Sequence, residues 1–252
     1  MSTMTRGLQV LEILAGMRQP ATLGAIAARA GLSESQTFRV LRALESDGYV
    51  DHFGRSGYRI GSRSLALATL VGPRPQLLRA VYPVITRLAT VSRQAAVLHL
   101  RSGAHRVLVL GVPSQSGPLR EPHGILGERS PLAVGASGRA ILAHLPADEV
   151  RGLAPDAATL ERLETIRDRG YETSYEENHP GINGISAPLL AQDSSDQVVL
   201  GAISLAGDAA DLPRERLEGM SRILLAACQE LAPRLSRILG PQASATVDAL
   251  DL

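Results

Sequence analysis

The residues best suited to a specific chemistry lie in the segment from Ser33 to Asp47. Ser33 is followed three residues later by Gln36, a spacing typical of a capping box at the start of a helix. Apolar residues repeat along one face of this segment. The outer face carries Glu34, Ser35, Gln36, Phe38, Arg39 and Arg42. Because glutamine can pair with adenine and arginine with guanine or phosphate, this face suits the reading of DNA in a major groove.

The residues before this segment predict a helix-turn-helix. Helices are expected at Thr5–Met17 and Leu23–Ala30, where apolar residues recur at helical spacing. Gly31 suits the left-handed residue that a tight helix end requires. Two short helices joined by a three-residue turn, the second capped by Ser33, place the recognition helix at Ser33–Asp47. The alternative is an ordinary helical hairpin in a protein core.

A hairpin is expected directly after the recognition helix. Tyr49–Phe53 and Tyr58–Ile60 are typical of two strands, with Gly54–Gly57 as the turn between them. Such a hairpin is a wing, and Arg55 at its tip could enter a minor groove. The capped helix, the wing and the local positive charge together favour DNA binding over a core hairpin. The candidate DNA-contacting residues are Ser33, Ser35, Gln36, Thr37, Phe38, Arg39, Arg42 and Arg55.

Charge is unevenly distributed along the 252 residues, although the net charge is only +1. Residues 1–63 hold eight Arg and five acids, residues 64–81 two Arg and no acid, and residues 82–252 sixteen Arg and twenty acids. A basic front and an acidic remainder indicate that only the front meets a polyanion. Aromatic residues are 3% of the chain, too few for the stacking platforms of single-strand binders.

Catalytic and metal-binding patterns are missing from the sequence. The six histidines form no H-E-x-x-H run, no G-x-S-x-G elbow occurs, and a chain without lysine cannot carry a Walker loop. Cys228 is the single cysteine, which excludes a disulfide framework and cysteine-rich metal sites. His99 and His105 could approach each other across a hairpin, but a third metal ligand is not evident. We therefore expect no enzyme, no cofactor and no metal.

The rest of the chain predicts an α+β fold. Helices at Ser62–Val71 and Gln76–Ser92 flank a break at Gly72–Pro75, with a kink at Pro83. Strands are then expected at Ala96–Leu100, Arg106–Leu110, Ile185–Leu190 and Val198–Leu205, and helices at Gly138–Leu145, Ala147–Leu153, Ala158–Arg169 and Arg214–Leu239. Strands flanked by helices in this order make an α+β sheet domain. The expected organisation is a winged helix-turn-helix domain at 1–61, a helical linker at 62–92, a sheet domain at 93–240 and a flexible tail at 241–252.

Several ordered blocks of residues carry a family resemblance. In the front domain they are Leu23–Ala27, Gly31–Ser33, Arg39–Glu45, Asp47–Val50 and Tyr58–Gly61; in the second domain they are Pro131–Ala143, Arg169–Tyr171, Glu176–Glu177, Pro180–Pro188 and Gly201–Leu205. With these blocks the sequence resembles the IclR family of bacterial transcriptional regulators over residues 4–239. The resemblance implies a GAF-like, effector-binding second domain. Gln36, Thr37, Ser174 and Ala206 depart from residues common in the family.

A ligand site is expected near the loop Pro131–Gly138. This loop of small residues leads into a helix, and backbone N–H groups near a helix N-terminus favour a carboxylate or a similar anion. The resemblance places the pocket between such a loop, the Gly184–Ala187 region and the last strand. The residues it implies are Ala133, Val134, Gly135, Ala136, Ser137, Ile141, Gly184, Ile185, Ser186 and Ser204. Residues 113–127 are either a lid over this pocket or, more commonly, a surface loop.

The expected function is a ligand-responsive, sequence-specific regulator of a catabolic or metabolic operon. The resemblance implies repression, a small organic acid as effector, and dimers that often pair into tetramers on double-stranded DNA with a near-palindromic operator. A cytoplasmic protein with no membrane contact is expected, since no apolar run is long enough for a membrane span. One alternative is a sensor or enzyme whose helix-turn-helix no longer binds DNA. Another is an architectural DNA protein, which the acidic second domain disfavours.

Overall fold

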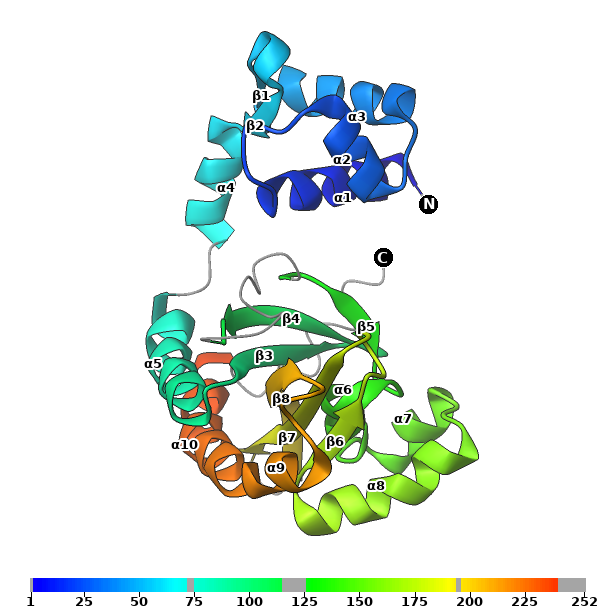
Figure 1. The fold of residues 1–252 in the computed structure, drawn as a ribbon, viewed down its shortest axis with the longest axis vertical. Coiled ribbons are helices and arrows are strands. Elements are labelled where there is room, and N and C mark those ends of the chain that lie inside the picture. The colour runs from blue at the N-terminus through cyan, green and yellow to red at the C-terminus, as the bar shows by residue number, and fades with distance from the viewer. Residues whose placement is uncertain (1, 72–74, 115–125, 194–195, 240–252) are drawn as a thin grey trace. The chain divides into compact units, whose positions relative to one another are not determined.

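The chain forms two compact units that divide between Pro75 and Gln76 (Figure 1). The structure, a computed structural model, describes residues 2–71, 75–114, 126–193 and 196–239. The division falls within the predicted linker, at the break between its two helices. The predicted tail at 241–252 and residues 115–125 of the possible lid lie outside the described residues.

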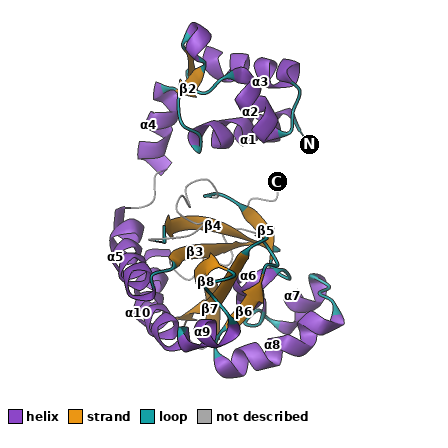
Figure 2. Cartoon of the chain, in the orientation of Figure 1, coloured by secondary structure: helices purple, strands orange, loops and turns teal. Residues whose placement is uncertain are grey.

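The first unit combines helices with one short hairpin (Figure 2). In chain order its elements are α1 (Thr3–Ala15), α2 (Leu23–Ala30), α3 (Glu34–Ser46), β1 (Val50–His52), the 3-10 turn η1 (Gly54–Ser56), β2 (Tyr58–Ile60) and α4 (Ser62–Val71). The three helices α1 to α3 enclose a core in which Leu14, Ile26 and Leu41 are fully buried. The predicted winged helix-turn-helix is confirmed.

The hairpin is attached to the helices by its second strand. Ala21 and Tyr58 exchange two backbone hydrogen bonds of 2.8 Å, so the chain before α2 pairs with β2. Gly57 makes this close approach possible, because a Cβ at this position would lie 2.2 Å from the carbonyl oxygen of Ala21. Its φ of 103° is also a conformation that favours glycine.

The second unit is built on one antiparallel sheet. In chain order its elements are α5 (Pro75–Ser92), β3 (Ala95–Ser102), β4 (His105–Val112), β5 (Arg129–Pro131), α6 (Gly135–Leu142), α7 (Ala147–Gly152), α8 (Ala157–Arg169), β6 (Glu172–Tyr175), β7 (Ile182–Asp193), β8 (Asp196–Asp208), α9 (Arg214–Gly219) and α10 (Ser221–Leu239). The strand order is β5-β4-β3-β8-β7-β6, and each described pair of neighbours is antiparallel.

Helices cover both faces of this sheet (Figure 1). One core lies between the sheet and the pair α5 and α10, where Ile85, Leu98 and Leu231 are among the buried residues. The other core lies between the sheet and α6 with α8, around Ile141 and Ile166. Successive side chains on one strand point to opposite faces of the sheet, so neighbouring residues pack in different cores. The architecture confirms the predicted α+β fold.

The structure differs from the predicted elements in three main respects. The helix predicted at Gly138–Leu145 is α6 at Gly135–Leu142, so the end of the predicted loop Pro131–Gly138 forms its first turn. The strands β5 and β6 were not predicted, because they are short and lack an alternating apolar pattern. Glu172, Thr173 and Ser174 of β6 are buried polar residues. The helix predicted at Arg214–Leu239 is two helices, α9 and α10, which meet at Met220. None of the described helices is both long and apolar enough to cross a membrane.

Candidate functional site

The N-terminus of α3 is fixed by a reciprocal pair of hydrogen bonds. The Ser33 hydroxyl accepts from the Gln36 backbone N–H at 3.3 Å, and the Gln36 Oε1 atom accepts from the Ser33 backbone N–H at 3.1 Å. Thr37 is fully buried, and its hydroxyl donates to the Ser33 carbonyl oxygen at 3.0 Å. These three candidate DNA-contacting residues therefore have roles inside the protein, and the Thr37 hydroxyl is not available to a base.

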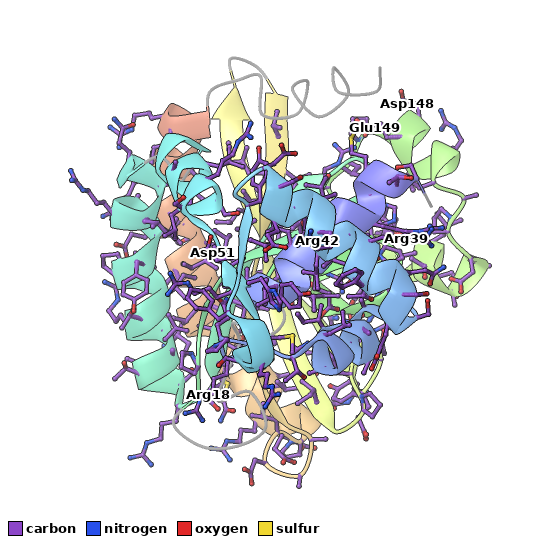
Figure 3. All side chains as sticks on the ribbon, turned by 90° about the horizontal axis from the view of Figure 1, so that it is seen from above. Arg18, Arg39, Arg42, Asp51, Asp148 and Glu149 are labelled. Carbon is purple, nitrogen blue, oxygen red and sulfur yellow. The ribbon has the colours of Figure 1, made fainter. Side chains whose placement is uncertain are left out.

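The exposed face of α3 carries the other candidates on this helix. Ser35, Phe38, Arg39 and Arg42 are all exposed and follow one another at helical spacing. Figure 3 shows that Arg39 and Arg42 extend from the same helix. Arg42 also forms an ion pair of 3.1 Å with Glu45, but its side chain remains 61% exposed. This face offers two guanidinium groups, a hydroxyl and an aromatic ring to a partner.

The hairpin tip adds further positive charge to the first unit. Arg55 lies in η1 and is exposed, as the sequence predicts. Arg59 on β2 pairs with Asp51 at 3.4 Å, and its guanidinium lies 4.3 Å from the centre of the Phe53 ring. Sequence reasoning missed Arg59, although its outward position in the strand Tyr58–Ile60 was a usable signal.

Replacing Ser33 with alanine is expected to destabilise the first unit. The variant loses the hydroxyl that caps the Gln36 N–H, so the free energy of unfolding should fall by about 1 kcal/mol. Urea unfolding of the full chain, followed by circular dichroism, measures this change. Ser46→Ala is the matched control at the other end of α3. Equal stabilities of the two variants would contradict the capping role.

A pocket of about 680 Å³, including its open mouth, lies in the second unit beside the N-terminal turn of α6. It is lined by residues from all six strands of the sheet, from the first turn of α6, from the segment after β6 and from the residue before β5. Its lining residues are Val97, His99, Arg106, Leu108, Glu128, Ser130, Ala136, Ser137, Ser174, Asn178, His179, Ile182, Gly184, Ser186, Ser204, Leu205 and Ala206.

Half of the predicted ligand-lining residues lie at this pocket. They are Ala136, Ser137, Gly184, Ser186 and Ser204. The other five, Ala133, Val134, Gly135, Ile141 and Ile185, are not among its lining residues. Ile141 and Ile185 are instead fully buried in the two apolar cores. Ile185 follows Gly184 on β7, so strand alternation turns it to the opposite face of the sheet.

Hydroxyl groups form one polar wall of the pocket. Ser186 on β7 and Ser204 on β8 are opposite each other in the sheet, and the Ser186 hydroxyl donates to the Ser204 hydroxyl at 2.7 Å. Ser174 on β6 lies opposite Gly184 in the next row of the sheet. Because Gly184 has no side chain, the backbone leaves space at this wall.

The N-terminus of α6 already holds a carboxylate of the protein. The Gly135 backbone N–H donates to Glu177 at 3.2 Å, and Arg139 binds the two oxygens of Glu177 at 2.5 and 2.8 Å. Burial alone would raise the pKa of Glu177, but the hydrogen bonds and the charge of Arg139 outweigh burial and lower this pKa. The sequence predicted an accessible helix end here, and it missed Glu177 as the group that occupies it.

Behind this helix end lies a buried cluster of opposite charges. Glu172 on β6 is fully buried, and its oxygens lie 2.6 Å from Arg162 and 3.0 Å from Arg169. Arg139 lies 3.7 Å from Glu172, so it forms ion pairs with both Glu172 and Glu177. The cluster joins α6, α8 and β6, and two of these elements, α6 and β6, also contribute lining residues to the pocket.

Arg106, His99, Glu128 and His179 are the charged or titratable lining residues that sequence reasoning missed. Arg106 is 2% exposed, and its Nη1 atom donates to the carbonyl oxygens of Pro131 at 2.6 Å and Val134 at 2.8 Å. Burial lowers the pKa of Arg106 to about 10. Burial and the neighbouring charge of Arg106 lower the pKa of His99 to about 3, so the imidazole is neutral. Arg106 and Leu108 are two positions apart on a predicted strand, so their side chains lie on the same face. This spacing was a signal that the Arg106 side chain points inward.

The described residues contain no arrangement typical of a metalloenzyme. No group of three or more His, Cys, Asp or Glu side chains in residues 2–71, 75–114, 126–193 and 196–239 could hold a metal ion. Cys228 is buried, and burial raises the pKa of its thiol to about 12. A thiol with this pKa is not a nucleophile near neutral pH.

Comparison with known proteins identifies the class to which this fold and these surfaces belong. Residues 3–52 match the IclR helix-turn-helix domain, and residues 73–233 match the family described as bacterial transcriptional regulator IclR C-terminal. The chain belongs to the IclR family, and it is a transcriptional regulator with a DNA-binding helix-turn-helix. Nothing in these matches indicates a catalytic function.

Individual relatives extend over most of the chain. The chain is 25% identical to the transcriptional repressor IclR of Escherichia coli over 244 residues, which cover 91% of this chain and 88% of that protein. The crystal structure of Thermotoga maritima IclR is similar with a TM-score of 0.67 and 23% identity, covering 91% of this chain and 97% of that one. An IclR homolog from Microbacterium hydrocarbonoxydans, complexed with 4-hydroxybenzoate, has a TM-score of 0.67 and 19% identity, covering 94% and 100%.

Proposed function

We propose that this regulator is a repressor of a catabolic or metabolic operon, and that a small organic acid controls its affinity for DNA. The observation that carries this proposal is the pairing of two features in one chain. An exposed face with Arg39 and Arg42 lies on α3, and a pocket with the buried charge of Arg106 lies in the second unit. The organic acid is also supported by the relative that binds 4-hydroxybenzoate, which is a carboxylic acid.

On the DNA side, a homodimer places two copies of α3 in successive major grooves of a near-palindromic operator. Arg39 and Ser35 face the bases. Arg42 and Arg55 face phosphate or the minor groove. Gln36 contributes only through the amide nitrogen, because its oxygen caps the helix. Two dimers can further associate as a homotetramer, and the protein acts in the cytoplasm, where its operator is.

Effector binding in the second unit affects the DNA-binding unit through the part of the chain that connects the two units. The helices α4 and α5 flank residues 72–74 and form the covalent route within one subunit. An effector changes DNA affinity only if it favours one arrangement of this route, and typical coupling of about 1–3 kcal/mol corresponds to a 5–150-fold change.

Arg39→Ala is expected to weaken operator binding by about 1–3 kcal/mol and to relax the preference at one base position. The reason is the loss of a side chain that can bind a guanine edge with two hydrogen bonds. Selection of bound fragments from the source genome, with wild type and variant in parallel, measures affinity and consensus together. Arg18→Ala is the matched control, since it removes the same charge from an exposed position outside α3.

The outcomes of this selection separate the candidate functions. A palindrome enriched by wild type and Arg18→Ala but blurred by Arg39→Ala supports a sequence-specific regulator. The genes beside that site then indicate the class of effector. A folded wild-type dimer that enriches no sequence, with or without candidate metabolites, favours a sensor or enzyme that no longer reads DNA. An unchanged consensus for Arg39→Ala removes Arg39 from the base-reading set.

A further inference from the structure

We infer that Phe38 on α3 contacts the C5-methyl group of a thymine in the operator, so that this thymine is selected by its methyl group and not by a hydrogen bond. This inference rests on the proposed function, because it requires α3 to lie in a major groove. It assigns the preference for one base to a side chain that carries neither a charge nor a hydrogen-bonding group.

The Phe38 side chain lies outside the core of the first unit. It is 45% exposed, and it belongs neither to the buried residues between α1, α2 and α3 nor to the partly buried residues packed against them. The whole of α3 lies within the described residues, and Phe38 is the one large apolar side chain exposed on this helix. Phe38 therefore contributes little to the packing of the unit, and its ring is available to a partner.

The second of the two phenylalanines in the chain has a partner that Phe38 lacks. Phe53 is also 45% exposed, but the guanidinium of Arg59 lies 4.3 Å from the centre of its ring. Among the described residues, no aromatic ring stacks on Phe38 and no cation lies over it. Arg42, one turn further along α3, pairs instead with Glu45 at 3.1 Å. The Phe38 ring is therefore left without the kind of contact that covers Phe53.

The neighbours of Phe38 indicate DNA as its partner. A single exposed apolar side chain is common on protein surfaces and is not a site by itself. Phe38, however, lies between Ser35 and Arg42 along one line of α3, with Arg39 beside it, and all four side chains are exposed. Guanidinium groups bind phosphates and guanine edges. A helix held in a major groove by these two arginines places the phenyl ring against the bases.

The thymine methyl is the apolar group that base pairs present in the major groove. Contact between this methyl and the phenyl ring removes apolar surface of both from water, which is favourable. A cytosine at the same position would turn its N4 amino group toward the ring. That amino group would lose water without gaining a hydrogen bond, which is costly. Phe38 should therefore favour thymine over cytosine, although it makes no polar contact.

Helix geometry predicts where this thymine lies in the operator. Consecutive residues are about 1.5 Å apart along a helix axis, and stacked bases are about 3.4 Å apart, so we expect the thymine within about two base pairs of the position that Arg39 reads. In the selection of genomic fragments, Phe38→Ala should therefore lose the preference for one thymine per half-site, next to the position that Arg39→Ala relaxes.

The decisive test replaces that thymine with uracil in one half-site of the selected operator. This change removes the methyl group and leaves the hydrogen-bonding edge of the base unchanged. Fluorescence anisotropy with the full chain measures the dissociation constants of the two duplexes. Wild type should bind the uracil duplex about fourfold more weakly, the effect of one buried methyl group. Phe38→Ala should bind both duplexes equally.

Two further variants control for weak binding and for side-chain size. Arg42→Ala should bind both duplexes more weakly than wild type but keep the difference between them, because the methyl contact remains. Phe38→Leu should keep part of the difference, because leucine is apolar but smaller. Circular dichroism of Phe38→Ala should show the unfolding transition of wild type, since Phe38 lies outside the core.

Three outcomes would overturn the role of Phe38 alone. In the first, wild type binds the thymine and uracil duplexes equally. In the second, Phe38→Ala keeps the full difference, so that another side chain contacts the methyl group. In the third, Phe38→Ala weakens binding to every sequence equally and keeps the consensus, so that the ring packs on the sugar-phosphate backbone.

Failure of the proposed function has a different signature in the same experiment. In each of these three outcomes wild type still enriches a palindrome, so sequence-specific binding stands without Phe38. A folded wild type that enriches no sequence, with or without candidate metabolites, would overturn both the proposed function and the role of Phe38.

Discussion

Glu172→Gln is expected to lower the free energy of unfolding of the second unit by about 3 kcal/mol. Glu172 is fully buried, and three arginines surround it: Arg162 at 2.6 Å, Arg169 at 3.0 Å and Arg139 at 3.7 Å. Glutamine keeps the shape but removes the charge, so Arg139, which is 5% exposed, retains only Glu177 as its acid. Because Arg162 and Arg169 are partly exposed, water compensates for part of the loss, and we expect the low end of the range for a broken buried pair.

The matched control is Glu230→Gln in the same unit. Glu230 on α10 also pairs with two arginines, Arg87 and Arg234, but all three side chains are substantially exposed. Exposed ion pairs contribute about 0–1 kcal/mol, so this variant should be close to wild type. Urea unfolding monitored by circular dichroism compares the two. A loss in Glu172→Gln no larger than in Glu230→Gln would show that the cluster does not hold the unit together.

This cluster also fixes the helix that borders the pocket. Arg139 joins Glu172 to Glu177, and Glu177 closes the N-terminus of α6. The charges that fix α6 are therefore paired with one another. A change at Glu172 should act on the pocket indirectly, through the position of α6.

The parts of the fold that the sequence predicted are those with local signals. The Ser33–Gln36 spacing marks the start of α3, Gly31 marks the turn before it, and turn residues separate β1 from β2. Each signal involves residues only a few positions apart, so it is readable without knowledge of the tertiary structure. The exposed Arg39 and Arg42 follow directly from the helical period of α3.

The parts that the sequence could not predict depend on residues distant in the chain. Glu177 reaches Gly135 and Arg139 across about forty positions, and no local pattern connects them. The buried Glu172 lies in a short polar strand that resembles a loop in sequence. Ile185 was placed in the pocket with Gly184 and Ser186 because the family resemblance covers a continuous block, whereas strand alternation divides that block between two faces.

Leu41→Ala is expected to unfold the first unit, and with it to remove operator binding. Leu41 is fully buried in the core that Leu14 and Ile26 share. Truncation of a buried leucine costs about 2–5 kcal/mol. The first unit ends at Pro75, and a domain of that size rarely has more than about 3–5 kcal/mol of stability. Most of that stability would therefore be lost. Leu160→Ala, at an exposed position of α8, is the matched control and should bind DNA like wild type.

The unfolding transition of the second unit gives this experiment its second readout. Arg39 and Leu41 lie two residues apart on opposite faces of α3, and both substitutions should weaken DNA binding for different reasons. Arg39→Ala should leave the first unit folded, whereas Leu41→Ala should remove the cooperative unfolding transition of the first unit and leave that of the second unit intact. If Leu41→Ala also removes the transition of the second unit, the two units do not fold independently, and DNA binding then depends on one cooperative structure.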